Sequence, residues 1–323
     1  MVVTTHPVSG ALQHRPLPAG SEAVAAEPPA PTDVAETEPL RPGTPLMAKV
    51  LAGALAGSAA LLAVNVVGHI AGLPGVGAKL AASALALGAA AGGYAAADVA
   101  SGVFHWAVDN YPDENTPVIG RLAADFQVHH HHGRNILRKS FWHNCALGGK
   151  FVVPMMAAVA LAQPHYLVAA GALTFFGGNV LAQGYHMWSH QGNQQTKLGA
   201  AFEKTGLAIS RRNHAKHHAM PWDDYYCIVN GMMNPLLHRV SFWRKLERGV
   251  HRLTGREPRS WRDPGVKALA MGEISLAEFQ EKVRRKEDLK AFRVAVEPER
   301  AQVAERLERQ MREARSLAGP PQA

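Results

Sequence analysis

Four long apolar stretches constrain the fold of this chain more than any other feature. A helix needs ~20 largely apolar residues to cross the hydrocarbon core of a bilayer. We expect such helices at about Leu46–Leu73, Leu80–Val108, Ala146–Ala162 and Tyr166–Met187. The chain is therefore predicted to be an all-α integral membrane protein with about four transmembrane helices. A soluble bundle is the alternative for the first pair, because those two segments are dominated by Ala and Gly and are only weakly hydrophobic.

The loops between these stretches predict the topology. The connections near residues 74–79 and 163–165 contain a single Lys, whereas the loops at the opposite ends carry many Arg and Lys residues. The positive-inside rule then places both termini, and any site at that end, on the cytoplasmic side. The net charge of +8 suits anionic lipid head groups or an acidic electron donor better than nucleic acid, because no nucleic-acid-binding motif is present. Cys145 and Cys227 are expected to be reduced thiols.

Composition divides the chain into three regions. Residues 1–45 are rich in Pro, Ala, Glu and Thr and are expected to be disordered. Residues 46–262 form the predicted membrane domain. Residues 263–323 are highly charged, with opposite charges at helical spacing, and are expected to form a helical tail at the surface.

Histidines at helical spacing gather at the predicted cytoplasmic ends of the apolar stretches. With ~3.6 residues per turn, two such motifs each place their histidines on one helix face. The members are His186 and His190 in one motif and His214, His217 and His218 in the other. Imidazoles converging on one point suit borderline metals such as iron and zinc. We interpret the chain as a membrane di-iron oxidase, most simply a lipid desaturase.

Three further histidine positions complete this predicted di-metal site. His129 and His130 follow the second apolar stretch, although the run continues through His131 and His132, so that His129 and His132 are an alternative pair. His105 joins the set because it lies near the end of the second stretch.

Two carboxylates flank His105. Asp109, four residues later, is expected to accept the second N–H of a ligand histidine, with direct metal ligation or a surface position as alternatives. Asp98 lies deeper in the apolar stretch, where an ionisable group is costly and usually functional. Asn179 and Gln183, one turn apart, either line a substrate slot or form hydrogen bonds between helices.

These motifs, taken together, resemble a known family. The relevant elements are Asp98-x3-Gly102-x2-His105-Trp106-x2-Asp109, Phe126-x2-His129-His130, His186-x-Trp188-Ser189-His190, His214-x2-His217-His218, Tyr226-Cys227-Ile228, Asn234-Pro235 and Phe242-Trp243-Arg244. Their order and spacing over about residues 90–262 are similar to the Kua/CarF family of plasmanylethanolamine desaturases. The resemblance implies an eight-histidine site, with a carboxylate beside the first histidine at Asp109. The implied ligands are His105, His129, His130, His186, His190, His214, His217 and His218.

The resemblance also implies a reaction. Members of the family remove two hydrogens from the 1-O-alkyl chain of an ether phospholipid, using O2, to give the vinyl ether of a plasmalogen. A related plastid branch desaturates an acyl chain instead. We therefore expect two Fe ions, O2 as co-substrate and a small electron-transfer protein similar to cytochrome b5 or a ferredoxin. The alternatives are an acyl-lipid desaturase or hydroxylase with the same metal site, and a histidine-rich membrane metal transporter or sensor.

Overall fold

The computed structural model describes residues 45–285 together with residues 302 and 305. These residues form helices and no strand, which confirms the predicted all-α class. The expected disorder of residues 1–45 falls almost wholly outside the described residues, as does most of the charged tail. The predicted domain boundaries therefore stay predictions.

Within the described residues, four helices are long and apolar enough to cross a membrane. They are α1 (Leu46–Gly72), α2 (Gly75–Asn110), α4 (Phe141–Leu161) and α5 (Tyr166–Ser189). These are the four predicted spans, and the prediction was wrong only at some of their ends.

Local chemistry explains the two shifted ends. The second span begins at Gly75 rather than Leu80. Lys79 can be part of this helix because its long aliphatic side chain lets the ammonium group reach water. The third span begins at Phe141 rather than Ala146. The Ser140 hydroxyl accepts a hydrogen bond from the His143 backbone N–H at 3.3 Å and so caps the first turn.

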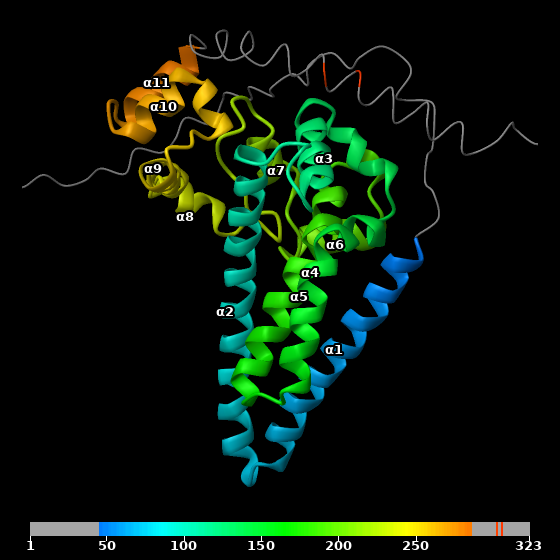
Figure 1. Cartoon of the computed structure of the whole chain (residues 1–323). Helices are drawn as coiled ribbons and strands as arrows, with labels where there is room; N and C mark the ends of the chain where they lie inside the picture. The colour runs from blue at the N-terminus through cyan, green and yellow to red at the C-terminus, as the bar shows by residue number, and fades with distance from the viewer. Residues whose placement is uncertain (1–44, 286–301, 303–304, 306–323) are drawn as a thin grey trace, which may run out of the picture. The chain divides into compact units, whose positions relative to one another are not determined.

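Helix α5 lies at the centre of the bundle and packs against α1, α2 and α4 (Figure 1). Small residues permit the close contacts between these helices. A Cβ atom at Gly93 of α2 would lie 2.2 Å from the Gly171 carbonyl oxygen of α5, and one at Gly178 would lie 3.0 Å from the Ala97 Cβ. Glycine is therefore required where α2 and α5 cross.

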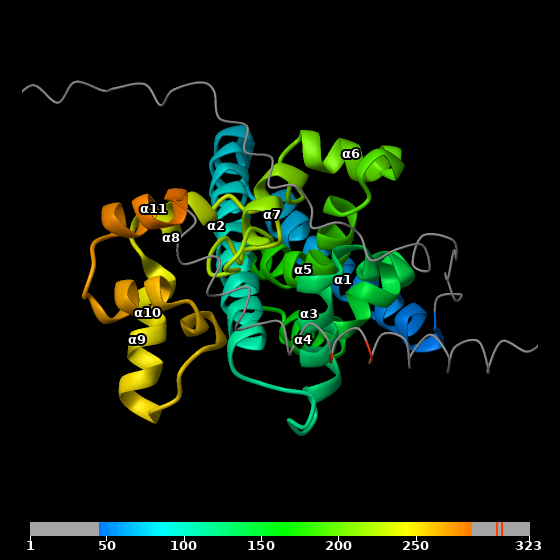
Figure 2. The ribbon, with the colours of Figure 1, turned by 90° about the horizontal axis from the view of Figure 1, so that it is seen from above.

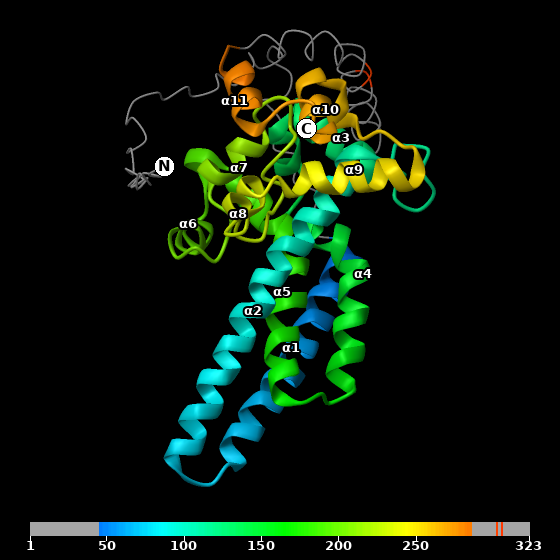
Figure 3. The same cartoon turned by 90° about the vertical axis from the view of Figure 1, so that its left-hand side faces the viewer.

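The shorter helices gather at one end of the bundle (Figures 1 and 3). Seen along the bundle, α9, α10 and α11 lie on the outer side of α2, away from α4 (Figure 2). The shorter elements are α3 (Gly120–His131), η1 (Gly133–Arg138), η2 (Gly192–Gln194), α6 (Lys197–Lys204), α7 (Arg211–His217), α8 (Asn234–Arg239), α9 (Phe242–Thr254), η3 (Arg259–Arg262), α10 (Pro264–Met271) and α11 (Leu276–Arg285).

Aromatic side chains hold this end of the molecule onto the bundle. Trp243 of α9 packs with Tyr226 and with Trp106 of α2 in one buried cluster. Trp188 of α5 belongs to a second cluster. Trp106 and Trp188 are both buried, with 4% and 7% of their surface exposed. Exposed aromatic side chains at this end include Phe104, which is 42% exposed, and Trp142, which is 38% exposed.

Candidate metal centre

Nine candidate ligands converge at the end of the bundle where the short helices gather. The helices α2, α3, α5 and α7 all contribute, so residues far apart in the sequence meet at one place. The side chains form two adjacent groups that could each hold a metal ion. The first comprises His129, His186, His190, His214 and His218, and the second comprises His105, Asp109, His130 and His217.

The first group, called the five-imidazole group below, contains no carboxylate. His218 lies at its centre, with its Nε2 atom 2.9 Å from the Nε2 atom of His214 and 3.1 Å from that of His129. The rings of His186 and His190 lie 5.1 Å apart, centroid to centroid, and both face His214. The Nε2 atoms of His186 and His190 are buried and have no hydrogen-bond partner.

The second group, called the Asp109 group below, adds a negative charge to three imidazoles. The Asp109 Oδ2 atom lies 3.3 Å from His105 Nε2, 3.4 Å from His130 Nε2 and 3.6 Å from His217 Nε2. The Nε2 atoms of His130 and His217 are 3.0 Å apart. Both carboxylate oxygens of Asp109 are buried without a hydrogen-bond partner.

These separations fit bound metal ions. Two nitrogens that bind one first-row ion at about 2.1 Å and at right angles lie roughly 3 Å apart. Buried nitrogen and oxygen atoms are rarely left without a partner in the absence of a ligand or water. The residues therefore fit two metal ions, one in each group, and the donor set suits iron.

Backbone and amide oxygens orient three of the imidazoles. The Nδ1–H groups of His105 and His217 donate to the carbonyl oxygens of Tyr226 and Asp224 at 3.0 and 2.9 Å. The His186 Nδ1–H donates to the Gln183 side-chain oxygen at 3.2 Å. Because an amide or carbonyl oxygen can only accept, each ring carries its proton on Nδ1 and presents the Nε2 lone pair to the candidate metal position.

Burial keeps the ligand imidazoles outside the membrane spans in the neutral form. It lowers the pKa of His190 to about 3 and that of His217 to about 4. Burial also lowers the pKa of His129, His214 and His218 far below the ordinary value, and neighbouring histidines lower it further. A neutral imidazole is the form that binds metal, so these side chains need no deprotonation near neutral pH.

The structure brings all eight predicted histidines together. Of the run from His129 to His132, it is His129 and His130 that join the two groups, whereas the alternative pair containing His132 does not form. His132 instead follows the end of α3.

Asp109 does not have the supporting position that was favoured from the sequence. The His105 Nδ1–H is already bonded to Tyr226, so Asp109 faces the Nε2 atoms among the candidate ligands. The alternative of direct ligation fits this geometry.

Two polar residues of α5 have different roles from those considered. Gln183 orients His186, and Asn179 donates to the Phe175 carbonyl oxygen of its own helix at 2.9 Å. The sequence could have predicted this role, because Gln183 lies three residues before His186 and residues at this spacing are neighbours on a helix. No local pattern marks the carbonyl groups of Tyr226 and Asp224.

Asp98 holds a loop instead of binding metal. Its carboxylate accepts hydrogen bonds from the backbone N–H groups of Asn230, Gly231 and Met233 at 2.9–3.0 Å. The same loop contacts α7, because the Asn213 side chain donates to the Gly231 carbonyl oxygen. Asp98 therefore connects α2, which carries His105, to the helix that carries His214 and His217.

Comparison with known proteins identifies the family. A model of the lipid desaturase domain matches residues 94–261, which include all nine candidate ligands. The chain belongs to the lipid desaturase family. No solved structure matches the chain.

The chain is similar to relatives that are named as two kinds of desaturase. The chain is 36% identical over 184 residues to fatty acid desaturase 4 of Arabidopsis thaliana, covering 57% of each protein. It is 31% identical to the plasmanylethanolamine desaturase of Myxococcus xanthus, covering 61% of this chain and 70% of the relative. It is 30% identical to plasmanylethanolamine desaturase 1 of Mus musculus, covering 54% and 68%. The chain spans about three fifths of the length of the plant relatives.

Proposed function

We propose that this protein is an O2-dependent di-iron desaturase that converts the 1-O-alkyl chain of an ether phospholipid, plasmanylethanolamine, to the vinyl ether of a plasmalogen. The two adjacent ligand groups at one end of four apolar helices carry the proposal. Relatives named plasmanylethanolamine desaturase support this choice of substrate. Removing two hydrogens from the alkyl chain while O2 is reduced to two waters requires two further electrons and two protons.

The protein side chains prepare the site for this chemistry. Two iron ions bound here would supply the oxidising power needed to remove hydrogen from an unactivated C–H bond. The eight imidazoles would hold the ions without adding charge, and Asp109 would offset part of the positive charge of one of them. The Nδ1–H bonds of His105, His186 and His217 fix the orientation of these rings before any ion binds.

The depth of the site supports a double bond near the lipid head group. His186 is the twenty-first residue of α5, so it lies where a bilayer-spanning segment of ~20 residues ends. His105 lies in the last two turns of α2. The site therefore lies at the head-group end of the spans, and the first two alkyl carbons of an ether lipid are the chain carbons nearest to it.

We further propose that the site faces the cytoplasm and receives electrons from a small acidic protein, similar to cytochrome b5 or a ferredoxin. Exposed Arg211, Arg212 and Lys216 belong to the loops and helices at the histidine end. At the other end the short turn between α1 and α2 leads to the single Lys79. This asymmetry supports the orientation through the positive-inside rule.

Mass spectrometry of ether lipids tests the proposed function. Cells that lack plasmalogens would be fed an alkylglycerol and would express the intact protein, His186→Ala or His251→Ala. The His251 ring packs on Trp261, outside both ligand groups, so this variant is the matched control. We expect acid-labile vinyl ethers with the intact protein and with His251→Ala, and none with His186→Ala. Vinyl ethers formed at equal rates by all three proteins would contradict the proposal.

An acyl-lipid desaturase is the second candidate, and the 36% identity to fatty acid desaturase 4 favours it. The same experiment separates the two. A new acyl double bond that depends on His186, with unchanged alkyl ethers, would assign the acyl reaction to this site.

A further inference from the structure

Large apolar side chains are exposed in the loops outside the bundle. Two belong to α6 and the segment after it, namely Leu198, 59% exposed, and Leu207, 47% exposed. Three belong to α8 and its flanks, namely Met232, Leu236 and Val240, which are 55%, 50% and 41% exposed. We call these five residues the apolar collar. Exposed apolar patches of this kind usually mark contact surfaces.

Hydrogen bonds to α2 place the collar at a defined level along the bundle. The Tyr94 hydroxyl donates to the Leu207 carbonyl oxygen, and Asp98 accepts from the Gly231 and Met233 N–H groups beside Met232. The 24 residues from Gly75 to Asp98 rise about 35 Å at ~1.5 Å per residue. Since the hydrocarbon core is about 30 Å thick, the collar lies at its edge, among the lipid head groups.

The two halves of the collar lie at a similar height. Figure 3 shows α6 and α8 at the end of the four-helix bundle, below α10 and α11. The side chain of Asn230 donates to the Gly206 carbonyl oxygen at 2.9 Å and so ties the loop before α8 to the turn after α6. The two halves of the collar are therefore held together and fixed to α2.

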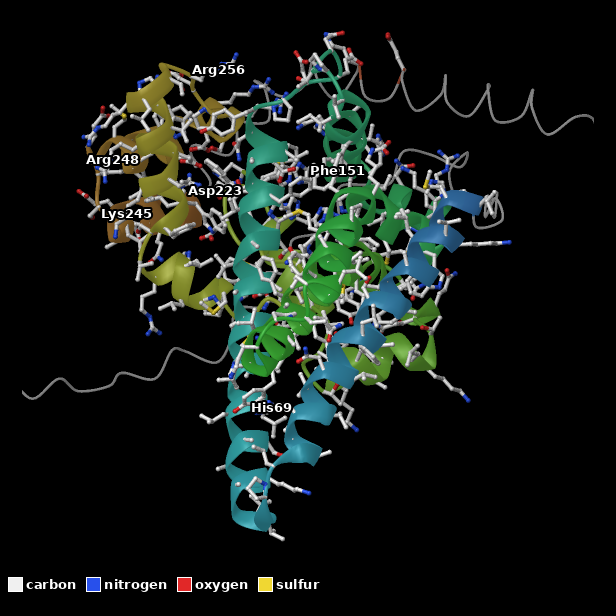
Figure 4. The ribbon with its side chains drawn as sticks, turned by 60° about the horizontal axis from the view of Figure 1, so that its bottom comes forward. His69, Phe151, Asp223, Lys245, Arg248 and Arg256 are labelled. Atoms are coloured by element: carbon white, nitrogen blue, oxygen red, sulfur yellow. The ribbon has the colours of Figure 1, made fainter. Side chains whose placement is uncertain are left out.

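Exposed cations lie on the helices that carry the collar and on α9, which follows α8. They lie at both ends of α6 and along α8 and α9, namely Lys197, Lys204, Arg239, Lys245 and Arg252. Figure 4 labels Lys245 on the side of α9 that faces away from α2. The acidic residues of these helices are engaged elsewhere, because Glu203 accepts from Gln195 and Glu247 is buried against Arg244.

We propose that the collar and its cations form a binding surface for anionic phospholipids. The apolar side chains enter the head-group layer and the cations bind lipid phosphates, as in helices that lie in the membrane interface. Through Asp98 and Tyr94, this contact fixes the depth of α2, which carries His105 and Asp109 of the metal centre. The proposal rests on the four spans and not on the reaction, so loss of the proposed activity would leave it standing.

Fluorescence quenching in vesicles tests the depth of the collar. Both native cysteines are buried, so a single introduced cysteine can be labelled with a small fluorophore. The full chain would carry Leu236→Cys or, as the matched control, Met271→Cys. Met271 is 40% exposed at the end of α10, which lies far from the bundle in Figures 1 and 3. Vesicles would contain phosphatidylcholine with or without phosphatidylglycerol, together with brominated lipid.

We expect brominated lipid to quench the label at position 236 about threefold more than at position 271, and aqueous iodide to show the reverse order. Addition of phosphatidylglycerol should increase the lipid quenching at position 236, and Arg239→Glu with Lys245→Glu should remove that increase. Met232→Cys provides a second collar position if Leu236→Cys fails to fold. Equal quenching by iodide at positions 236 and 271 would overturn the proposal, and a contact with a protein partner would then be the better explanation of the exposed apolar side chains. Quenching that ignores phosphatidylglycerol would overturn its anionic part.

Discussion

The five-imidazole group and the Asp109 group differ in charge. Both are buried, and both take a histidine from each of α3 and α7. The first, however, offers only neutral nitrogens, whereas the second adds the Asp109 carboxylate within 3.6 Å of three imidazoles. Two ions held in such surroundings are not equivalent. The position beside Asp109 tolerates a higher positive charge, and the five-imidazole position depends on how accurately its rings are placed.

The largest expected effect is at the carboxylate. Asp109→Asn removes the negative charge but keeps the size of the side chain, so an ion in the Asp109 group loses its charge compensation. We expect bound iron to fall from two ions to one per chain and turnover to be abolished. Elemental analysis of the purified protein measures the iron. Asp125→Asn is the control, because Asp125 pairs with Lys139 at 2.5 Å outside both groups. Two irons per chain in Asp109→Asn would remove Asp109 from the ligand set.

A smaller effect, confined to the five-imidazole group, is expected from Gln183→Leu. The variant removes the acceptor that orients His186, and loss of such a partner typically lowers metal affinity by about 10–100-fold. Asn179→Leu, one turn earlier on α5, breaks only a hydrogen bond within the helix and should keep wild-type affinity. Competition with a chelator gives the affinity of each site. Weakening of both sites to the same extent would show that the two groups are not independent.

Asp98→Asn should weaken both groups together. The carboxylate holds three backbone N–H groups in the loop that contacts α7, and α7 carries ligands of both. Hydrogen bonds to a charged acceptor contribute more than neutral ones, so we expect the free energy of unfolding of the metal-free protein to fall by about 1–3 kcal/mol. Thermal unfolding in detergent measures this. An unchanged unfolding temperature would exclude the anchoring role of Asp98.

The contrast between the groups also shows what the sequence can predict. Ligands on one helix face, such as His186 and His190, follow from the 3.6-residue period, and the four spans follow from apolar length. The sequence pointed to Asp109 as part of the site, but we expected its carboxylate to accept the N–H that faces away from the metal. In the structure the carboxylate faces the Nε2 atom of His105 instead. This arrangement depends on the Tyr226 carbonyl, which is 121 residues from His105 in sequence. No local sequence pattern predicts a hydrogen-bond partner at such a separation.

The sequence also did not show which distant segments bury the residues near the ends of the spans. Asp98 was correctly singled out as costly, yet the loop that satisfies it comes from residues 230–233. Trp106 and Trp188 are likewise buried by residues from distant segments, such as Trp243 and Ile209. These features depend on how the covering segments fold back, which hydropathy does not encode.

The smallest expected effect is a pH dependence tied to the Asp109 group alone. Asp224 accepts the His217 Nδ1–H through its backbone, and its carboxylate forms an ion pair with His238. The hydrogen bond between the His238 ring and the Asp224 carboxylate raises the pKa of His238 above its ordinary value of about 6.5. The folded protein therefore binds the proton more tightly than the unfolded chain. The resulting stabilisation is fully present below about pH 6.5 and is lost as the pH rises through the raised pKa.

Because both partners are partly exposed, we expect this pair to contribute less than about 1 kcal/mol. His238→Gln should lower the unfolding temperature of the metal-free protein at pH 6, and the difference from wild type should shrink towards pH 9. His251→Gln, whose ring packs on Trp261 instead of a carboxylate, is the control and should give a constant difference. A His238→Gln difference that is equally large at pH 6 and pH 9 would show that the side chain acts through packing. In that case Asp224 would position His217 without help from the ion pair, and the Asp109 group would depend on its backbone contact alone.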